Sequence, residues 1–173
     1  MFPDSGKGGN QPRHMGLVLG RQPLGVQQGI LINDNIDAIG LSRTNIGLKG
    51  TSNFRISGLF GWNEIHRNNH VEDKDDWMLA LFSEADTYRR TINLDMVYIN
   101  SNAQMGSGLY LAASHFRPVY MFNSTVRVAF SKAIDEETEA VTDGLMIFNE
   151  LSWSPFDRTD IVYFNSFLGF DNF

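Results

Sequence analysis

Residues 124–133 (STVRVAFSKA) carry the pattern that most limits what this chain can fold into. Val126, Val128 and Phe130 alternate with polar or small residues, which predicts a strand with one apolar face. An acidic stretch without apolar periodicity follows at 134–143, a second strand pattern begins at Gly144, and a short turn at 155–159 leads into a third. This order of strand, long polar loop, strand and short turn can be laid over nearly the whole chain, as in an up-and-down β-barrel.

The length and hydropathy of the chain restrict which β-folds the pattern can represent. The chain has 173 residues, of which 42% are hydrophobic and 20% charged, and these values are ordinary for one globular domain. The sequence contains no run of about 18 apolar residues, so a transmembrane helix is not expected. Strands of a membrane barrel need only about 9–11 residues each, and polar residues alternate with their lipid-facing ones. A bland overall hydropathy is therefore compatible with a membrane barrel.

Charge and residue types argue against several other classes of function. The net charge is −6, and no Lys/Arg cluster is present, so we expect no nucleic-acid partner. The chain has no cysteine, which excludes disulfides and thiolate metal sites. His66 and His70 are four residues apart, but they fall in a stretch rich in Asn and Asp that is interpreted as a solvated loop. We therefore expect no metal site, no cofactor and no catalytic constellation, and we expect that the protein is not an enzyme.

The same alternation predicts an all-β fold, an antiparallel up-and-down meander of about nine strands. Residues 1–12 are interpreted as a flexible lead-in, residues 22–35 as a long loop, and residues 36–48 as a strand with a bulge or phase shift. No segment shows a convincing helical stripe. The expected strands cover residues 14–21, 36–48, 54–65, 77–84, 91–100, 108–115, 124–133, 144–153 and 161–170.

Two features favour a transmembrane barrel over a soluble antiparallel sandwich. Polar, charged loops at 66–76, 101–107 and 134–143 alternate with links at 85–90, 116–123 and 155–159 that are shorter or carry aromatics, as extracellular loops alternate with periplasmic turns. Aromatic residues also gather near both ends of the strands, which suits two membrane interfaces. They are Trp62, Trp77 and Tyr98 at the loop side and Tyr88, Tyr120, Phe122, Trp153 and Phe156 at the turn side.

A family resemblance rests on the first two predicted strands. The segment GLVLGRQPLG at 16–25, followed by a Gly29-containing loop and NDNIDAIGLSR at 33–43, resembles the strand–loop–strand pattern of the alginate-export and related substrate-specific porins of Gram-negative outer membranes. The matching residues are Gly20, Arg21, Gln22 and Asp37. The resemblance implies a channel in the cell outer membrane, with lipid and a small-molecule or anionic solute as partners. It also implies a barrel of about 14–18 strands, of which residues 1–173 would be an internal portion.

The polar face of the strands supplies the expected lumen of such a channel. Arginines along a lumen would favour anionic solutes. A soluble carbohydrate-binding sandwich and, less readily, a β-sheet glycosidase with an Asp/Glu pair remain the alternatives. The expected lumen-lining residues are Arg43, Arg55, Asn63, Asn93, Asp95, Arg127 and Glu150, to which the resemblance adds Arg21.

Overall fold

The computed structural model describes residues 14–30, 32–62, 76–100, 107–134, 143–153 and 161–171. The lead-in at 1–12, Asn63, the His66/His70 pair and most of the long polar loops lie outside these residues, as does the turn at 155–159. The described residues form nine strands: β1 (Met15–Val26), β2 (Ile32–Arg43), β3 (Asn53–Trp62), β4 (Trp77–Thr87), β5 (Arg90–Asn100), β6 (Gly108–Val119), β7 (Phe122–Ala133), β8 (Gly144–Trp153) and β9 (Val162–Asp171).

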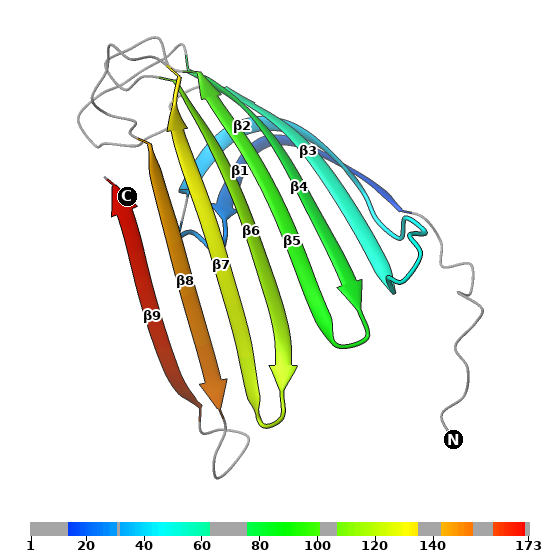
Figure 1. Cartoon of the computed structure of the whole chain (residues 1–173). Helices are drawn as coiled ribbons and strands as arrows, with labels where there is room; N and C mark the ends of the chain where they lie inside the picture. Colours follow the sequence, from blue (N-terminus) through cyan, green and yellow to red (C-terminus); the bar gives the residue numbers. More distant parts are fainter. Residues whose placement is uncertain are drawn as a thin grey trace.

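The strands form a single curved sheet in chain order, from β1 to β9 (Figure 1). Every neighbouring pair is antiparallel, which confirms the expected all-β, up-and-down meander. Among the described residues no ladder joins β1 to β9, so the sheet is open, and no second sheet faces it as a sandwich would require. The same residues contain no helix that is long and apolar enough to cross a membrane.

The two faces of the sheet differ in composition. On the convex face, aliphatic and aromatic side chains are exposed from one edge of the sheet to the other. On the hollow face, the same strands carry a buried apolar cluster near the loop end and polar side chains farther along. Exposed convex residues include Leu19, Leu41, Phe60, Leu79, Leu94, Leu111, Val128 and Leu168.

The first hairpin is the main departure from the expected fold. Residues 22–35 are not a long loop: β1 continues to Val26 and β2 begins at Ile32, with a tight turn between them. Pro23 lies on β1, an edge strand of the described sheet, and edge strands are among the few places in a sheet where proline occurs. Leu24 and Val26 continue the alternation of β1 and are buried.

Smaller corrections concern the strand ends. The second strand ends at Arg43, not at 48, because Asn45 has a positive φ of 56° and turns the chain towards β3. The links at 85–90 and 116–123 are shorter than expected, since β4 and β6 extend into them. The strand ends joined by the polar loops of β3–β4 and β7–β8 lie at one end of the sheet, and the β4–β5 turn lies at the other.

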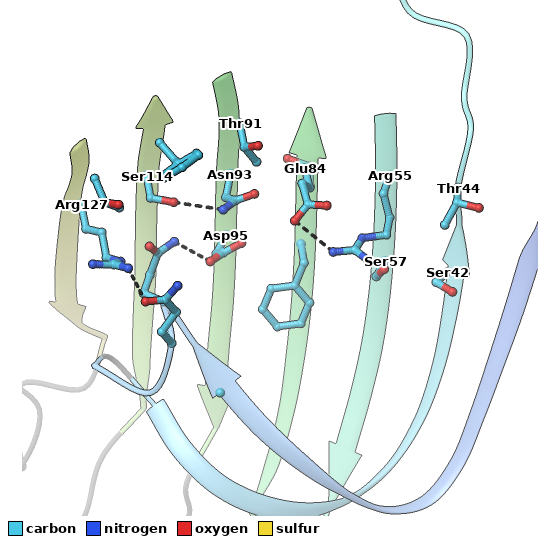
Figure 2. A pocket seen from close by; sticks show the side chains of 17 residues that line it. Ser42, Thr44, Arg55, Ser57, Glu84, Thr91, Asn93, Asp95, Ser114 and Arg127 are labelled. Atoms are coloured by element: carbon cyan, nitrogen blue, oxygen red, sulfur yellow. Dashed lines mark hydrogen bonds and ion pairs between the residues drawn. The ribbon is translucent and has the colours of Figure 1, made fainter. Parts of the chain in front are cut away.

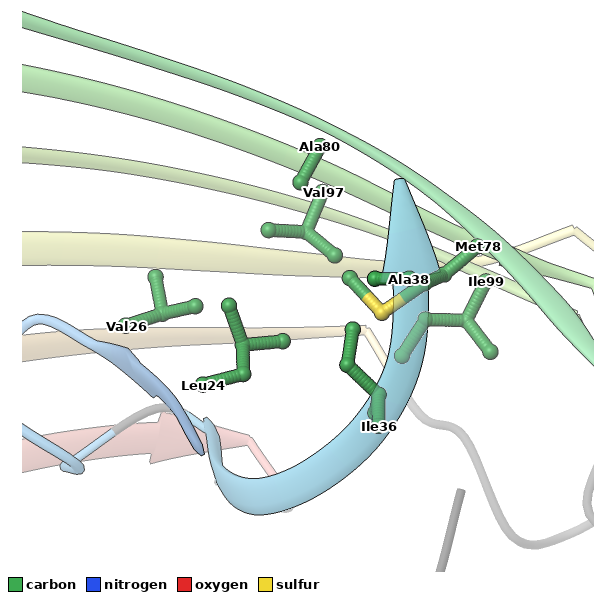
Figure 3. Packing of buried hydrophobic residues seen from close by; sticks show 8 residues of the cluster. All are labelled: Leu24, Val26, Ile36, Ala38, Met78, Ala80, Val97 and Ile99. Carbon is green, nitrogen blue, oxygen red and sulfur yellow. The ribbon is translucent and has the colours of Figure 1, made fainter. Parts of the chain in front are cut away.

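The β1–β2 hairpin arches over the hollow face (Figure 1). β2 pairs with β3 only from Asp37 onward, so residues 32–36 pair with β1 alone and project beyond β3. The inner side of this projection packs on β4 and β5 and makes the main apolar core (Figure 3). Full burial of an aliphatic side chain contributes about 1.5–3 kcal/mol to the free energy of folding, so this contact stabilises the packing of the hairpin on the sheet. The core residues are Leu24, Val26, Ile36, Ala38, Met78, Ala80, Val97 and Ile99.

Gly61 in β3 gives the hairpin room to approach the sheet. A Cβ at this position would lie 2.8 Å from Ile36 Cδ1 and 2.9 Å from Met78 Cγ. Both side chains are fully buried, so neither can move aside without disturbing the core.

We therefore predict that Gly61→Ala lowers the free energy of unfolding by about 1–3 kcal/mol, the usual cost of overpacking a core. Gly58→Ala in the same strand is the control, because its Cβ would have open space within 4 Å. Adding Ile36→Val to Gly61→Ala removes Cδ1 and should restore part of the loss. Denaturant titration of the refolded chains measures all three, and equal losses for Gly58→Ala and Gly61→Ala would contradict this role of Gly61.

Candidate functional site

Five polar side chains form a straight line across the hollow face. Consecutive members stand directly opposite each other in the ladders of β3 to β7 (Figure 2). Strands lie about 4.8 Å apart, so each member is within reach of the next. We call this set the polar row; its members are Arg55, Glu84, Asn93, Ser114 and Arg127.

The polar row is linked within itself at two places. Arg55 Nη2 forms an ion pair with Glu84 Oε2 at 3.0 Å. Asn93 Nδ2 donates a hydrogen bond to Ser114 Oγ at 3.1 Å. Both members of the ion pair are partly open to solvent, so the pair contributes at most about 1 kcal/mol, and its main effect is to fix the positions of the two charges.

Arg127 is the buried end of the polar row. Only 3% of the residue is exposed. Its Nη2 donates to Gln28 Oε1 in the hairpin turn, and its guanidinium lies 5.2 Å from the centroid of the Phe148 ring, within cation–π range. Among the described residues Nη1 has no hydrogen-bond partner. A buried unpaired donor costs roughly 1–3 kcal/mol, so this arginine is held in place by its surroundings at a cost to stability.

The turn of the β1–β2 hairpin supplies the wall opposite the polar row. Gln27 and Gln28 adopt positive φ values of 52° and 60°, and Gly29 follows at 83°. Non-glycine residues adopt this left-handed region at an energetic cost. Gln27 Nε2 donates to Asp95 Oδ2 at 2.6 Å, and Gln28 accepts from Arg127, so both side chains tie the turn to the hollow face.

A pocket of about 620 Å³ lies between the hairpin turn and the hollow face. Its charged lining consists of Arg55, Arg127, Glu84 and Asp95, so cationic and anionic side chains are equal in number. Phe82 and Phe116 add aromatic surface. Hydroxyl groups complete the wall, from Ser42, Thr44, Ser57, Ser83, Thr91, Ser114 and Thr125. The volume falls within the range of about 300–1,000 Å³ that is typical of small-molecule sites.

The expected lumen residues divide between the two faces. Arg55, Asn93, Asp95 and Arg127 line the pocket. Glu150 stands opposite Thr125, a pocket residue, and therefore lies on the same hollow face outside the pocket. Asn63 lies outside the described residues.

Two arginines require a correction, because the register places both on the convex face. Arg43 pairs with Ile56, and both share the face of Phe60. Arg21 pairs with Asp37, which stands opposite Trp62 on that same face. Arg43 continues the alternation of Ile39 and Leu41 along β2, and both of these residues are exposed on the convex face.

Several site residues were not singled out from the sequence. Glu84 and Ser114 continue the alternation of predicted strands, so the same rule applied to every strand would have found them. Gln27 and Gln28 were assigned to a loop, and no local signal indicates that their side chains reach Asp95 and Arg127, which are 68 and 99 residues away. The described residues contain no group of three potential metal ligands.

Comparisons with known proteins add no identification to this geometry. No family model matches the chain, and neither a curated protein nor a solved structure matches it.

Proposed function

We propose that this chain forms part of the wall of a β-barrel channel in a bacterial outer membrane, of the substrate-specific porin type, through which small solutes pass passively. The observation that carries the proposal is the apolar convex face. Leu79 is 50% exposed, Leu94 57% and Leu168 58%, on three different strands of that face. A sheet in water covers its apolar face or keeps exposed apolar patches small. Lipid-facing strands show the opposite arrangement, with apolar residues outside and polar residues inside.

Aromatic side chains at the two ends of the convex face support the proposal. Trp77 lies 5.3 Å from Tyr98 and 6.3 Å from Phe60 between ring centroids, at the loop end of β3 to β5. At the turn end, the Phe122 and Trp153 centroids are 5.7 Å apart. Amphipathic rings of this kind favour the headgroup level of a bilayer. The strands between the two bands have 10–12 residues, close to the 9–11 that a tilted spanning strand needs.

Closure of the barrel requires strands beyond the nine described. Because successive strands alternate in direction, β1 and β9 run the same way and cannot form an antiparallel pair with each other. Their outer N–H and C=O groups would be unpaired in lipid, where each costs several kcal/mol. We therefore propose that an odd number of further strands completes the barrel, which agrees with the even strand counts of bacterial single-chain barrels.

The hairpin and the polar row together give the channel its selectivity. The β1–β2 turn lies across the hollow face and narrows the passage, and the polar row is the wall that faces it. A solute that passes must exchange its water for these side chains. This role requires positioning of solutes and no catalysis.

Arginine substitutions on one strand test the orientation of the sheet in lipid. Val128 lies at mid-strand on the convex face of β7, and Ser124 lies on the same face near the turn. We predict that Val128→Arg lowers the free energy of unfolding in lipid vesicles by about 2–4 kcal/mol, whereas Ser124→Arg near the interface lowers it by about 0–1 kcal/mol. Similar small effects at both positions would contradict burial of this face in lipid, because Val128 is 38% exposed and water would accept its arginine.

Cell fractionation and conductance test the proposed function directly. We predict that the full chain, made in a Gram-negative host with an export signal, sediments with outer membranes and is released only by detergent. Addition of the purified protein to planar bilayers should give discrete conductance steps. Recovery of a monodisperse, detergent-free protein in the soluble fraction would overturn the assignment.

A further inference from the structure

We propose, resting on the channel function above, that the polar row binds a neutral, hydroxyl-rich solute of saccharide chemistry and is not an anion site. The proposal departs from the expectation that arginines along the lumen select anions. Three properties of the pocket support it: the pairing of its charges, the polar atoms without hydrogen-bond partners, and the chemical group that can bond to those atoms.

The pocket has two cationic and two anionic side chains, and each of the four makes a polar contact with another side chain. Arg55 is paired with Glu84 at 3.0 Å, and Asp95 accepts from Gln27 at 2.6 Å. An anionic solute would meet two carboxylates in the same pocket, at side chains on β4 and β5. Like charges in a partly buried pocket are screened less than on an open surface, so this repulsion opposes anion binding. Attraction from Arg55 is weakened because its partner carboxylate is adjacent.

Two buried atoms of the polar row remain without partners in the described part of the chain. One is Arg127 Nη1, a donor, on a residue of which 3% is exposed. The other is Asn93 Oδ1, an acceptor. These two residues flank Ser114 in the register, so the free donor and the free acceptor belong to the same line of side chains (Figure 2).

A hydroxyl group matches this combination, whereas a carboxylate does not. Each hydroxyl donates one hydrogen bond and accepts others, so neighbouring hydroxyls of one molecule can accept from Arg127 and donate to Asn93. An ionised carboxylate only accepts, and it would leave Asn93 Oδ1 facing another acceptor. The rings of Phe82 and Phe116 in the pocket wall offer an apolar surface for the C–H face of a sugar ring. The pocket volume of about 620 Å³ admits a mono- or disaccharide.

Calorimetric titration of the detergent-solubilised full chain with three matched sugars tests the proposal. The probes are methyl glucoside, which is neutral, methyl glucuronide, which is anionic, and glucosamine, which is cationic. We expect methyl glucoside to bind at least tenfold more tightly than methyl glucuronide. Tighter binding of methyl glucuronide, or equal binding of all three sugars, would overturn the saccharide site.

Two variants with matched controls locate the binding. Arg127→Lys keeps the positive charge but loses the second guanidinium nitrogen, and it should weaken methyl glucoside binding at least tenfold. Asn93→Asp adds a charge at nearly constant shape and should shift the preference towards glucosamine. The controls are Arg117→Lys, on the convex face by register, and Asn123→Asp, on the hollow face near the turn and outside the pocket, and they should change neither affinity. Equal effects of site and control variants would overturn the placement at the polar row.

Conductance measured on the same samples separates this inference from the channel function. A chain that forms pores but fails to bind methyl glucoside overturns the saccharide inference and leaves the channel intact. A chain that binds methyl glucoside with the expected variant pattern but neither inserts nor conducts supports the saccharide site and overturns the channel.

Discussion

The backbone ladder holds this sheet in one register from β3 to β8, and that register determines which side chains meet. Arg55 and Arg127 are 72 positions apart in the sequence, yet four successive cross-strand pairs place them at the two ends of one row. A slip of one residue in any strand would turn all of its side chains to the opposite face. In β7 such a slip would put Val128 where Arg127 now contacts the hairpin, and it would expose a charge on the apolar face. The difference between the two faces and the polar row therefore depend on the same hydrogen bonds.

The unequal lengths of two neighbouring ladders account for the second main feature of the fold. β1 and β2 pair over twelve residues, whereas β2 and β3 pair over seven. Ile32 and Ile36 are two of the five residues of β2 without a partner on β3, and water is a poor solvent for their side chains. Both pack into the apolar cluster at the hollow face, and Gly61 leaves the space for Ile36. Because the β1–β2 hairpin is longer than the β2–β3 ladder, Gln27 and Gln28 in its turn reach Asp95 and Arg127. The length by which the hairpin extends beyond β3 therefore determines the lining of the pocket.

The strands were predictable because alternation is a local property, and the pocket was not because it depends on contacts between distant segments. The residues from 91 to 100 and from 124 to 133 show a clean period of two, and both strands were expected within two residues of their bounds. The residues from 22 to 35 contain Pro23, Gly25 and Gly29, which usually mark loops, so the hairpin that forms one wall of the pocket was missed. Four of the expected lumen residues lie in the pocket because alternate side chains of a strand point to the same face of the sheet. The contacts of Gln27 and Gln28 depend on how far the β1–β2 hairpin extends beyond β3, and the sequence carries no local signal for that length.

The odd number of described strands also limits how such a sheet can be enlarged. A meander grows most simply by gaining hairpins, and each hairpin adds two strands and leaves the outermost strands running in the same direction. No series of hairpin additions would therefore give this sheet edges that pair antiparallel. Duplication of the nine strands would give an even strand number. The first strand of the second copy would then run opposite to β1, so the second copy would have its long loops at the end of the sheet where the first copy has its turns. Closure of this sheet into an antiparallel barrel therefore needs a step that adds or removes an odd number of strands.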